Sequence, residues 1–176
     1  MQARDLTKPA LCVALCCVTA HISFPLPFTP GYVTALTFAL SLTAYLLPPR
    51  RTFTVVLLYI LMGAVGLPVF ATGEGLSRLL GPVGGFYFAW PVAYPLLSLA
   101  KGAPPNLKRY ALTNILIAVP LTYAGGLASM IFFLHVELWQ ALTMAVFPFV
   151  FGDMLKAVAA AVLGVRLQKI FAGREL

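Results

Sequence analysis

Charged residues are scarce in this chain of 176 residues. Asp, Glu, Lys and Arg together make up 10% of it, whereas 61% is hydrophobic and the mean hydropathy is +0.94. Soluble domains are typically about one quarter charged. The composition therefore excludes an ordinary soluble domain. It predicts one integral membrane domain that covers residues 1–176 and has the lipid bilayer as its surroundings.

The chain also lacks the sequence patterns of common enzymes and metal sites. No glycine-rich loop is followed by Lys and Ser or Thr, so we do not expect this chain to hydrolyse ATP itself. No Ser/His/Asp or Cys/His arrangement is visible, and His21 and His135 lie far apart without Cys or acidic residues at ligand spacing. The cysteines Cys12, Cys16 and Cys17 share one apolar segment, which predicts packing rather than disulfides. We expect no enzymatic activity, no metal and no cofactor.

Six apolar segments are candidates for membrane-spanning helices. Prolines and glycines separate them, and their approximate bounds are 9–27, 33–47, 52–67, 83–100, 109–134 and 149–168. The second and third are at or below the ~17 residues that a perpendicular span needs. The first run continues past Ala20, which favours an uncleaved span over a removed signal peptide. Residues 138–147 are too short to cross and predict a short helix at the outer rim. The six spans predict the fold class, an all-α membrane protein with six transmembrane helices.

Lys and Arg lie mainly on one side of this arrangement. With the N-terminus inside, ten of the twelve are on the inner side, only Arg78 is in an outer loop, and Lys156 is within the sixth span. Because cytoplasmic loops carry an excess of Lys and Arg, this predicts a multi-pass protein of the cytoplasmic membrane with both termini cytoplasmic. The same pattern explains the net charge of +7, so we expect no nucleic acid among the partners.

The outer connection at 66–85 is rich in glycine yet apolar. A segment of this kind is expected to fold back as a lid over a cavity. Within it, Arg78 is a candidate to bind an anionic ligand, because its guanidinium matches a carboxylate; the alternative is a pair with Glu74, one helical turn away. Tyr87 and Trp90 follow at the outer end of the fourth span, either as ligand contacts or as members of the interfacial aromatic belt.

Asp153 and Lys156 are the only charged residues between Glu137 and Arg166. Three residues apart, they share one face of the sixth predicted helix. On the insertion scale each costs about 2.5–3.5 kcal/mol at the centre of a membrane-spanning helix. We interpret them as the floor of an outward-facing pocket, where Lys156 binds a carboxylate and Asp153 accepts hydrogen bonds from N–H groups. The alternative is a structural ion pair that locks helix packing.

Small residues recur at a spacing of four in two predicted helices. Ala10 and Ala14 have this spacing on the first helix, and Ala157 and Ala161 on the sixth. Such pairs allow another helix to approach closely. Packing within the chain is their usual role, and docking of another subunit is the alternative.

Several blocks resemble the BioY family, which comprises the biotin-specific S components of energy-coupling-factor (ECF) transporters. The blocks follow in order along nearly the whole chain: PLPFTP at 25–30, GAVGLPVF at 63–70, LGPVGGF at 80–86 and GDMLK at 152–156. The second and third are the most specific of them. The resemblance implies a six-helix bundle of the S-component type that takes up biotin across the cytoplasmic membrane.

The resemblance also implies residue roles and partners. Asp153 and Lys156 would line the biotin site, with Arg78 and Tyr87 as further candidates, and Ala10 and Ala14 would dock onto a coupling subunit. The implied partners are a transmembrane coupling protein and two ATPase subunits. Some family members occur without a recognisable coupling module, so a solitary biotin transporter is the alternative.

From the chemistry of biotin, Lys156 helped by Arg78 would hold one polar end of the ligand, and Asp153 would accept from N–H at the other. The chain departs from the family in two places. Residues 34–37 read Thr-Ala-Leu-Thr where the family often has Thr-Leu-Gln-Thr, which predicts one polar side chain fewer near the pocket. Residues 73–78 also differ from the usual glycine-rich loop.

Overall fold

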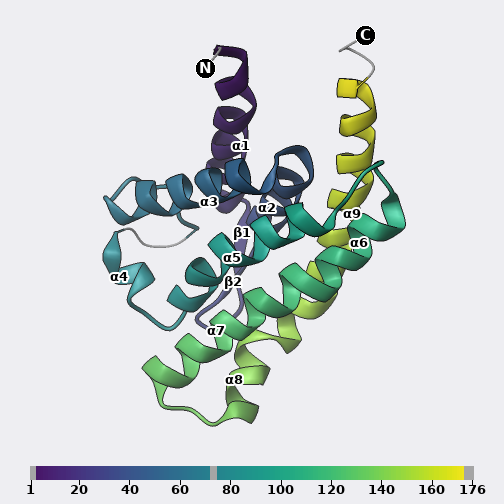
Figure 1. Ribbon diagram of the computed structural model, residues 1–176. Helices are drawn as coiled ribbons and strands as arrows, with labels where there is room; N and C mark the ends of the chain where they lie inside the picture. Colours follow the sequence, from purple (N-terminus) through teal and green to yellow (C-terminus); the bar gives the residue numbers. More distant parts are fainter. Residues whose placement is uncertain (1–2, 72–74, 173–176) are drawn as a thin grey trace.

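The structure is a computed structural model that describes residues 3–71 and 75–172. Figure 1 shows a bundle of helices with both chain ends at one end of the molecule, which we call the terminal end. The longer helices are α1 (Ala3–His21), α2 (Leu36–Leu46), α3 (Pro49–Ala64), α5 (Gly84–Ala100), α7 (Val119–Leu134) and α9 (Phe147–Ala172). The shorter elements are β1 (Ser23–Pro25), β2 (Tyr32–Thr34), α4 (Leu76–Leu79), α6 (Leu107–Thr113), the π-helical turn η1 (Asn114–Ala118) and α8 (Leu138–Ala145).

The six predicted spans correspond to α1, α2, α3, α5, the continuous α6–η1–α7 helix, and α9. The short helix expected at 138–147 is confirmed as α8. By length and composition, two helices of the described residues are long and apolar enough to cross a membrane, Leu107–Leu134 and Phe147–Phe171. At ~1.5 Å per residue the 11 residues of α2 span only ~16 Å, about half the ~30 Å hydrocarbon core. Most of α2 is buried, so it is a core helix that its neighbours surround.

The predicted end of the first span, residue 27, is wrong. Helix α1 ends at His21, and β1 then pairs antiparallel with β2 in a hairpin that lies over the opposite end of α2 from the terminal end. Pro25, Pro27 and Pro30 have no backbone N–H and cannot continue a helix, so the chain turns back instead. The third span also ends early, at Ala64 rather than 67, because Gly66 takes a φ of 94° and Pro68 follows.

Helix α5 lies between α3 and α7, and α2 packs along α9. The contact between α5 and α7 depends on glycine: a methyl group added at Gly85 would overlap the carbonyl oxygen of Gly125. This close approach brings the first turn of α5 beside the middle of α7. Tyr87 and Trp90 of α5 then line the same cavity as Thr122 and Tyr123 of α7.

The C-terminal end of α2 is tied down by donors from other helices. Two prolines follow it, so Pro48 and Pro49 cannot donate to the carbonyls of Ala44 and Tyr45 four residues earlier. Lys101 Nζ supplies the missing donor, at 2.7 Å from Ala44 O, 2.8 Å from Tyr45 O and 2.6 Å from Leu47 O. This cluster holds the terminal end of α2 against the end of α5.

Candidate functional site

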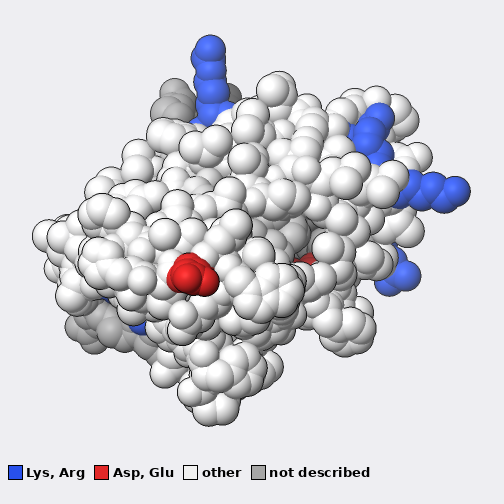
Figure 2. Space-filling model, turned by 90° about the horizontal axis from the view of Figure 1, so that it is seen from below, with Lys and Arg blue, Asp and Glu red and all other residues white. Residues whose placement is uncertain are grey.

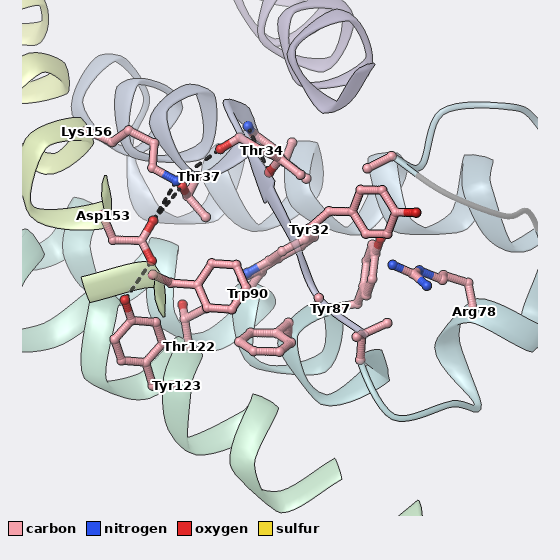
Figure 3. A pocket seen from close by; sticks show the side chains of 16 residues that line it. Tyr32, Thr34, Thr37, Arg78, Tyr87, Trp90, Thr122, Tyr123, Asp153 and Lys156 are labelled. Atoms are coloured by element: carbon pink, nitrogen blue, oxygen red, sulfur yellow. Dashed lines mark hydrogen bonds and ion pairs between the residues drawn. The ribbon is translucent and has the colours of Figure 1, made fainter. Parts of the chain in front are cut away.

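A pocket opens among six segments of the chain: the β1–β2 hairpin, the start of α2, the α3–α5 connection, α5, α7 and α9 (Figure 3). The volume open to the centre of a water molecule is about 80 Å³, and the total empty space, which extends into open solvent, is about 650 Å³. Its walls are mainly apolar or aromatic, formed by Leu36, Val83, Phe86, Trp90 and Phe149. On the face opposite the termini, Lys and Arg are visible only toward the edges, an acidic side chain is exposed near the middle, and a smaller acidic area is visible inside a hollow (Figure 2).

Asp153 and Lys156 form one polar end of this pocket. Lys156 Nζ lies 2.6 Å from Asp153 Oδ1, and it also donates to Thr34 O at 3.0 Å. Tyr123 donates from its hydroxyl to Asp153 Oδ2 at 2.7 Å, and Thr37 Oγ1 donates to Oδ1 at 3.3 Å. The side chain of Asp153 is 11% exposed and that of Lys156 is 19% exposed, so both still face the cavity. The pair thus has the geometry of an ion pair and also lines the cavity.

Arg78 lies at the opposite end of the pocket from this pair, with Tyr32, Tyr87 and Trp90 between them (Figure 3). Its guanidinium carbon is 6.0 Å from the centre of the Tyr32 ring, within cation–π range. The rings of Tyr87 and Trp90 are 4.6 Å apart between centroids and form one aromatic wall. Both aromatic side chains are buried within the protein, so they are pocket residues rather than part of an exposed belt. Glu74, the alternative partner of Arg78, lies outside the described residues.

Several buried polar atoms in the pocket have no hydrogen-bond partner within the described residues. Arg78 Nε, Trp90 Nε1 and Thr122 Oγ1 all belong to pocket-lining side chains, and Arg109 Nε elsewhere is the fourth such atom. Buried polar groups are normally paired, because leaving one unpaired costs about 1–3 kcal/mol. Three of them around one cavity mark it as the candidate functional site.

The four residues that the sequence predicts at the site all line one pocket: Arg78, Tyr87, Asp153 and Lys156. Thr122 and Tyr123 of α7 also line it and are not predicted, although they are polar residues inside a long apolar segment. Thr37 faces the pocket and contacts Asp153, whereas Leu36 makes the neighbouring wall apolar. The expectation of one polar group fewer at residues 34–37 agrees with this wall.

Ala10 and Ala14 lie away from the pocket, exposed on the surface of α1. The core-facing side of the same helix is formed by Cys12, Val13 and Cys16. Ala157 and Ala161, with the same spacing, are buried inside the bundle. Within the described residues, therefore, only the second pair packs internally, and the first pair is accessible to another protein.

The arrangement of helices and pocket defines a membrane-embedded protein of the S-component type. The fold is similar to the crystal structure titled "S-component for biotin from an ECF-type ABC transporter", with a TM-score of 0.86 and 23% sequence identity; the match covers 96% of this chain and 95% of that one. The sequence model of the BioY family matches residues 1–173, and the chain belongs to this family.

Curated relatives agree with this assignment over nearly their full length. The biotin transporter BioY of Thermotoga maritima is 33% identical over 168 residues, which is 95% of this chain and 97% of the relative. The biotin transporter BioY2 of Lactococcus lactis is 34% identical over 164 residues, which is 93% and 89% of the two chains. The family resemblance and the S-component fold expected from the sequence are thereby confirmed.

Proposed function

We propose that this protein binds biotin on the outer side of the cytoplasmic membrane and delivers it inward as the S component of an ECF-type transporter. One observation carries the proposal: in a member of the BioY family, a paired Asp and Lys inside an apolar bundle line a pocket that retains unpaired polar groups. The relatives named biotin transporters give the ligand its identity.

Biotin has a carboxylate tail, a polar ureido ring and an apolar body, and the pocket has a corresponding layout. Asp153 and Lys156 are only 2.6 Å apart, which favours their holding the same end of the ligand over the opposite ends expected from the sequence. A carboxylate beside an ammonium instead suits the ureido ring, which offers N–H donors and a carbonyl acceptor side by side. The charge of Lys156 is already balanced by Asp153.

Arg78 is the better partner for the biotin carboxylate. It lies at the far end of the pocket, and its Nε has no partner within the described residues. A guanidinium binds a carboxylate through two parallel hydrogen bonds. The aromatic wall of Tyr87 and Trp90 then contacts the apolar body between the two ends.

The proposed orientation puts both termini and the C-terminal end of α2 in the cytoplasm, because the inner connections carry most of the Lys and Arg. The proposed partners are a transmembrane coupling protein and two ATPase subunits. Ala10 and Ala14 support this, because their exposed small side chains allow a partner helix to approach α1 closely. Replacing both with Leu should abolish docking and uptake while biotin affinity is unchanged.

Two measurements test the proposal. Purified protein in detergent should bind radiolabelled biotin at one site per chain, and a failure to bind would refute the ligand assignment. Uptake is then measured in cells that express this chain with and without a coupling protein and ATPases. We expect uptake to require the coupling subunits; full uptake by this chain alone would support the solitary alternative.

A further inference from the structure

A second, smaller cavity adjoins the pocket and lies one helical turn closer to the terminal end. It shares Thr37, Thr122, Tyr123 and Asp153 with the pocket. Its remaining wall is set back by four residues along the helices, with Ser41 after Thr37 on α2 and Ala157 after Asp153 on α9. The volume open to the centre of a water molecule in it is about 20 Å³. The Asp153 carboxylate therefore stands between two cavities, and only one of them is the proposed biotin site.

The deeper wall of this cavity is polar in the middle of an apolar bundle. Asn114 Nδ2 donates to Ser41 Oγ at 2.9 Å, and Ser41 Oγ donates to Thr37 O at 2.7 Å. Tyr94 completes this wall, and it, Ser41 and Asn114 are each no more than 3% exposed. Burying such groups is unfavourable unless hydrogen bonds compensate them. Their concentration around one cavity calls for an occupant that is itself polar.

Thr122 gives the second, independent observation. Its side chain is 5% exposed, it lines the cavity, and its Oγ1 has no partner within the described residues. A threonine inside a helix commonly satisfies its hydroxyl with the carbonyl three or four residues earlier, as Thr113 does with Arg109 and Tyr110. Thr122 does not, so its hydroxyl remains available to a molecule in the cavity.

The charge balance selects the occupant. The ammonium of Lys156, 2.6 Å from Asp153, already neutralises the only acidic residue of the cavity, which disfavours a metal cation there. The wall offers both hydroxyl donors and oxygen acceptors, and water uses both. A water needs a volume of about 10–15 Å³ open to its centre, and the cavity offers about 20 Å³, so it has room for one.

We propose that the smaller cavity is a water site, in which one ordered water bridges Thr122 Oγ1 and the Asp153 carboxylate. The water would donate a hydrogen bond to the Asp153 carboxylate from the smaller cavity, and the other side of the carboxylate faces the ligand pocket. Thr122 is thus a positioning residue that acts through this water. The effect on ligand affinity rests on the proposed biotin function, whereas the water itself does not.

The first test is a crystal structure of the ligand-free protein at a resolution that shows ordered waters. We expect density within about 3.2 Å of both Thr122 Oγ1 and an Asp153 carboxylate oxygen. A cavity without density, or a Thr122 hydroxyl turned onto a backbone carbonyl of its own helix, would overturn the water site. This result is independent of whether the protein binds biotin.

The second test is biotin titration of Thr122→Val and Thr122→Ser. Loss of the hydroxyl should weaken binding about fivefold in the valine variant, and the serine variant should retain the parental affinity. Because Thr122 also touches the pocket, Ala157→Val serves as a second variant that narrows the cavity from its far side. Weaker binding by folded Ala157→Val supports the positioning role, and parental affinity in either valine variant would refute it. An unaltered chain that binds no biotin would instead refute the proposed function.

Discussion

The two ends of helix α2 differ in whether the buried polar groups around them have hydrogen-bond partners. At its C-terminal end, carbonyls that Pro48 and Pro49 leave without a donor are satisfied by Lys101 and by Gln168, which donates to Tyr45 O. At its N-terminal end, the pocket retains buried polar atoms that have no protein partner among the described residues. Complete pairing characterises a contact that maintains the fold. Incomplete pairing around a cavity is typical of a site that a ligand completes, which is the role we propose for this end.

This comparison predicts a separation of effects. Substitutions at the pocket end should change biotin affinity more than stability, and substitutions at the terminal end should do the reverse. The largest effect on biotin affinity is expected for Asp153 and Lys156, which form an ion pair that faces the pocket.

The double variant Asp153→Asn, Lys156→Met removes both charges together. Replacing a buried ion pair by uncharged residues is often neutral or stabilising, so the melting temperature should stay the same or rise. Biotin affinity should fall by about 3–5 kcal/mol, which is more than ~100-fold. Calorimetric titration and thermal unfolding in detergent measure the two quantities. Glu137→Gln, at an exposed acid, is the matched control and should change neither. A large loss of stability without a loss of affinity would assign the pair to helix packing.

The second prediction concerns Lys101→Met at the terminal end of α2. This change removes an ammonium that serves three carbonyls, and hydrogen bonds to charged groups each contribute about 1.5–3 kcal/mol. Because the chain can relax there, we expect a loss of about 2–4 kcal/mol in the free energy of unfolding. Biotin affinity of the folded fraction should be unchanged. Lys108→Met, at an exposed lysine of α6, is the control. A weaker biotin affinity in Lys101→Met would show that the two ends of α2 are coupled.

The sequence predicts the pocket end of α2 better than its terminal end. At the pocket end, Asp153 and Lys156 are conspicuous in the sequence, because two charges in an apolar run have few explanations. The partners of the α2 carbonyls are not conspicuous, since Lys101 is 54 residues from Leu47 and Gln168 is 123 residues from Tyr45. Both appear in the sequence as ordinary polar residues. Helix bounds fail for a local reason: apolar Phe24 and Leu26 extend the hydrophobic run, while the prolines around them require a hairpin. Sequence patterns thus identify unusual residues, whereas contacts between residues far apart in the chain become known only from the folded structure.

The third prediction addresses the far end of the pocket through Arg78→Gln. If Arg78 binds the carboxylate of biotin, the variant should lose about tenfold in affinity, a typical value for one charge-assisted interaction near the surface. Biotin amide, which lacks the carboxylate charge, should bind the parental protein about tenfold more weakly and should bind the variant as biotin does. This double comparison isolates the contact between the two groups. Equal losses for biotin amide in both proteins would remove Arg78 from the carboxylate site.

The smallest effect is expected at Ser98, which donates to Leu47 O at 2.6 Å beside Lys101. Ser98→Ala removes one neutral hydrogen bond, but Leu47 O keeps its bond from Lys101 and is not left unpaired. The loss should therefore lie at the lower end of the range for a single hydrogen bond, about 0.5–1 kcal/mol. In a Lys101→Met background the same change leaves Leu47 O with only the long bond of 3.5 Å from Thr52 Oγ1. The cost of Ser98→Ala should then rise to about 1–3 kcal/mol, because this long bond replaces the lost donors poorly. Thermal unfolding of the four combinations measures this coupling, and additive losses would show that Thr52 or solvent already satisfies Leu47 O.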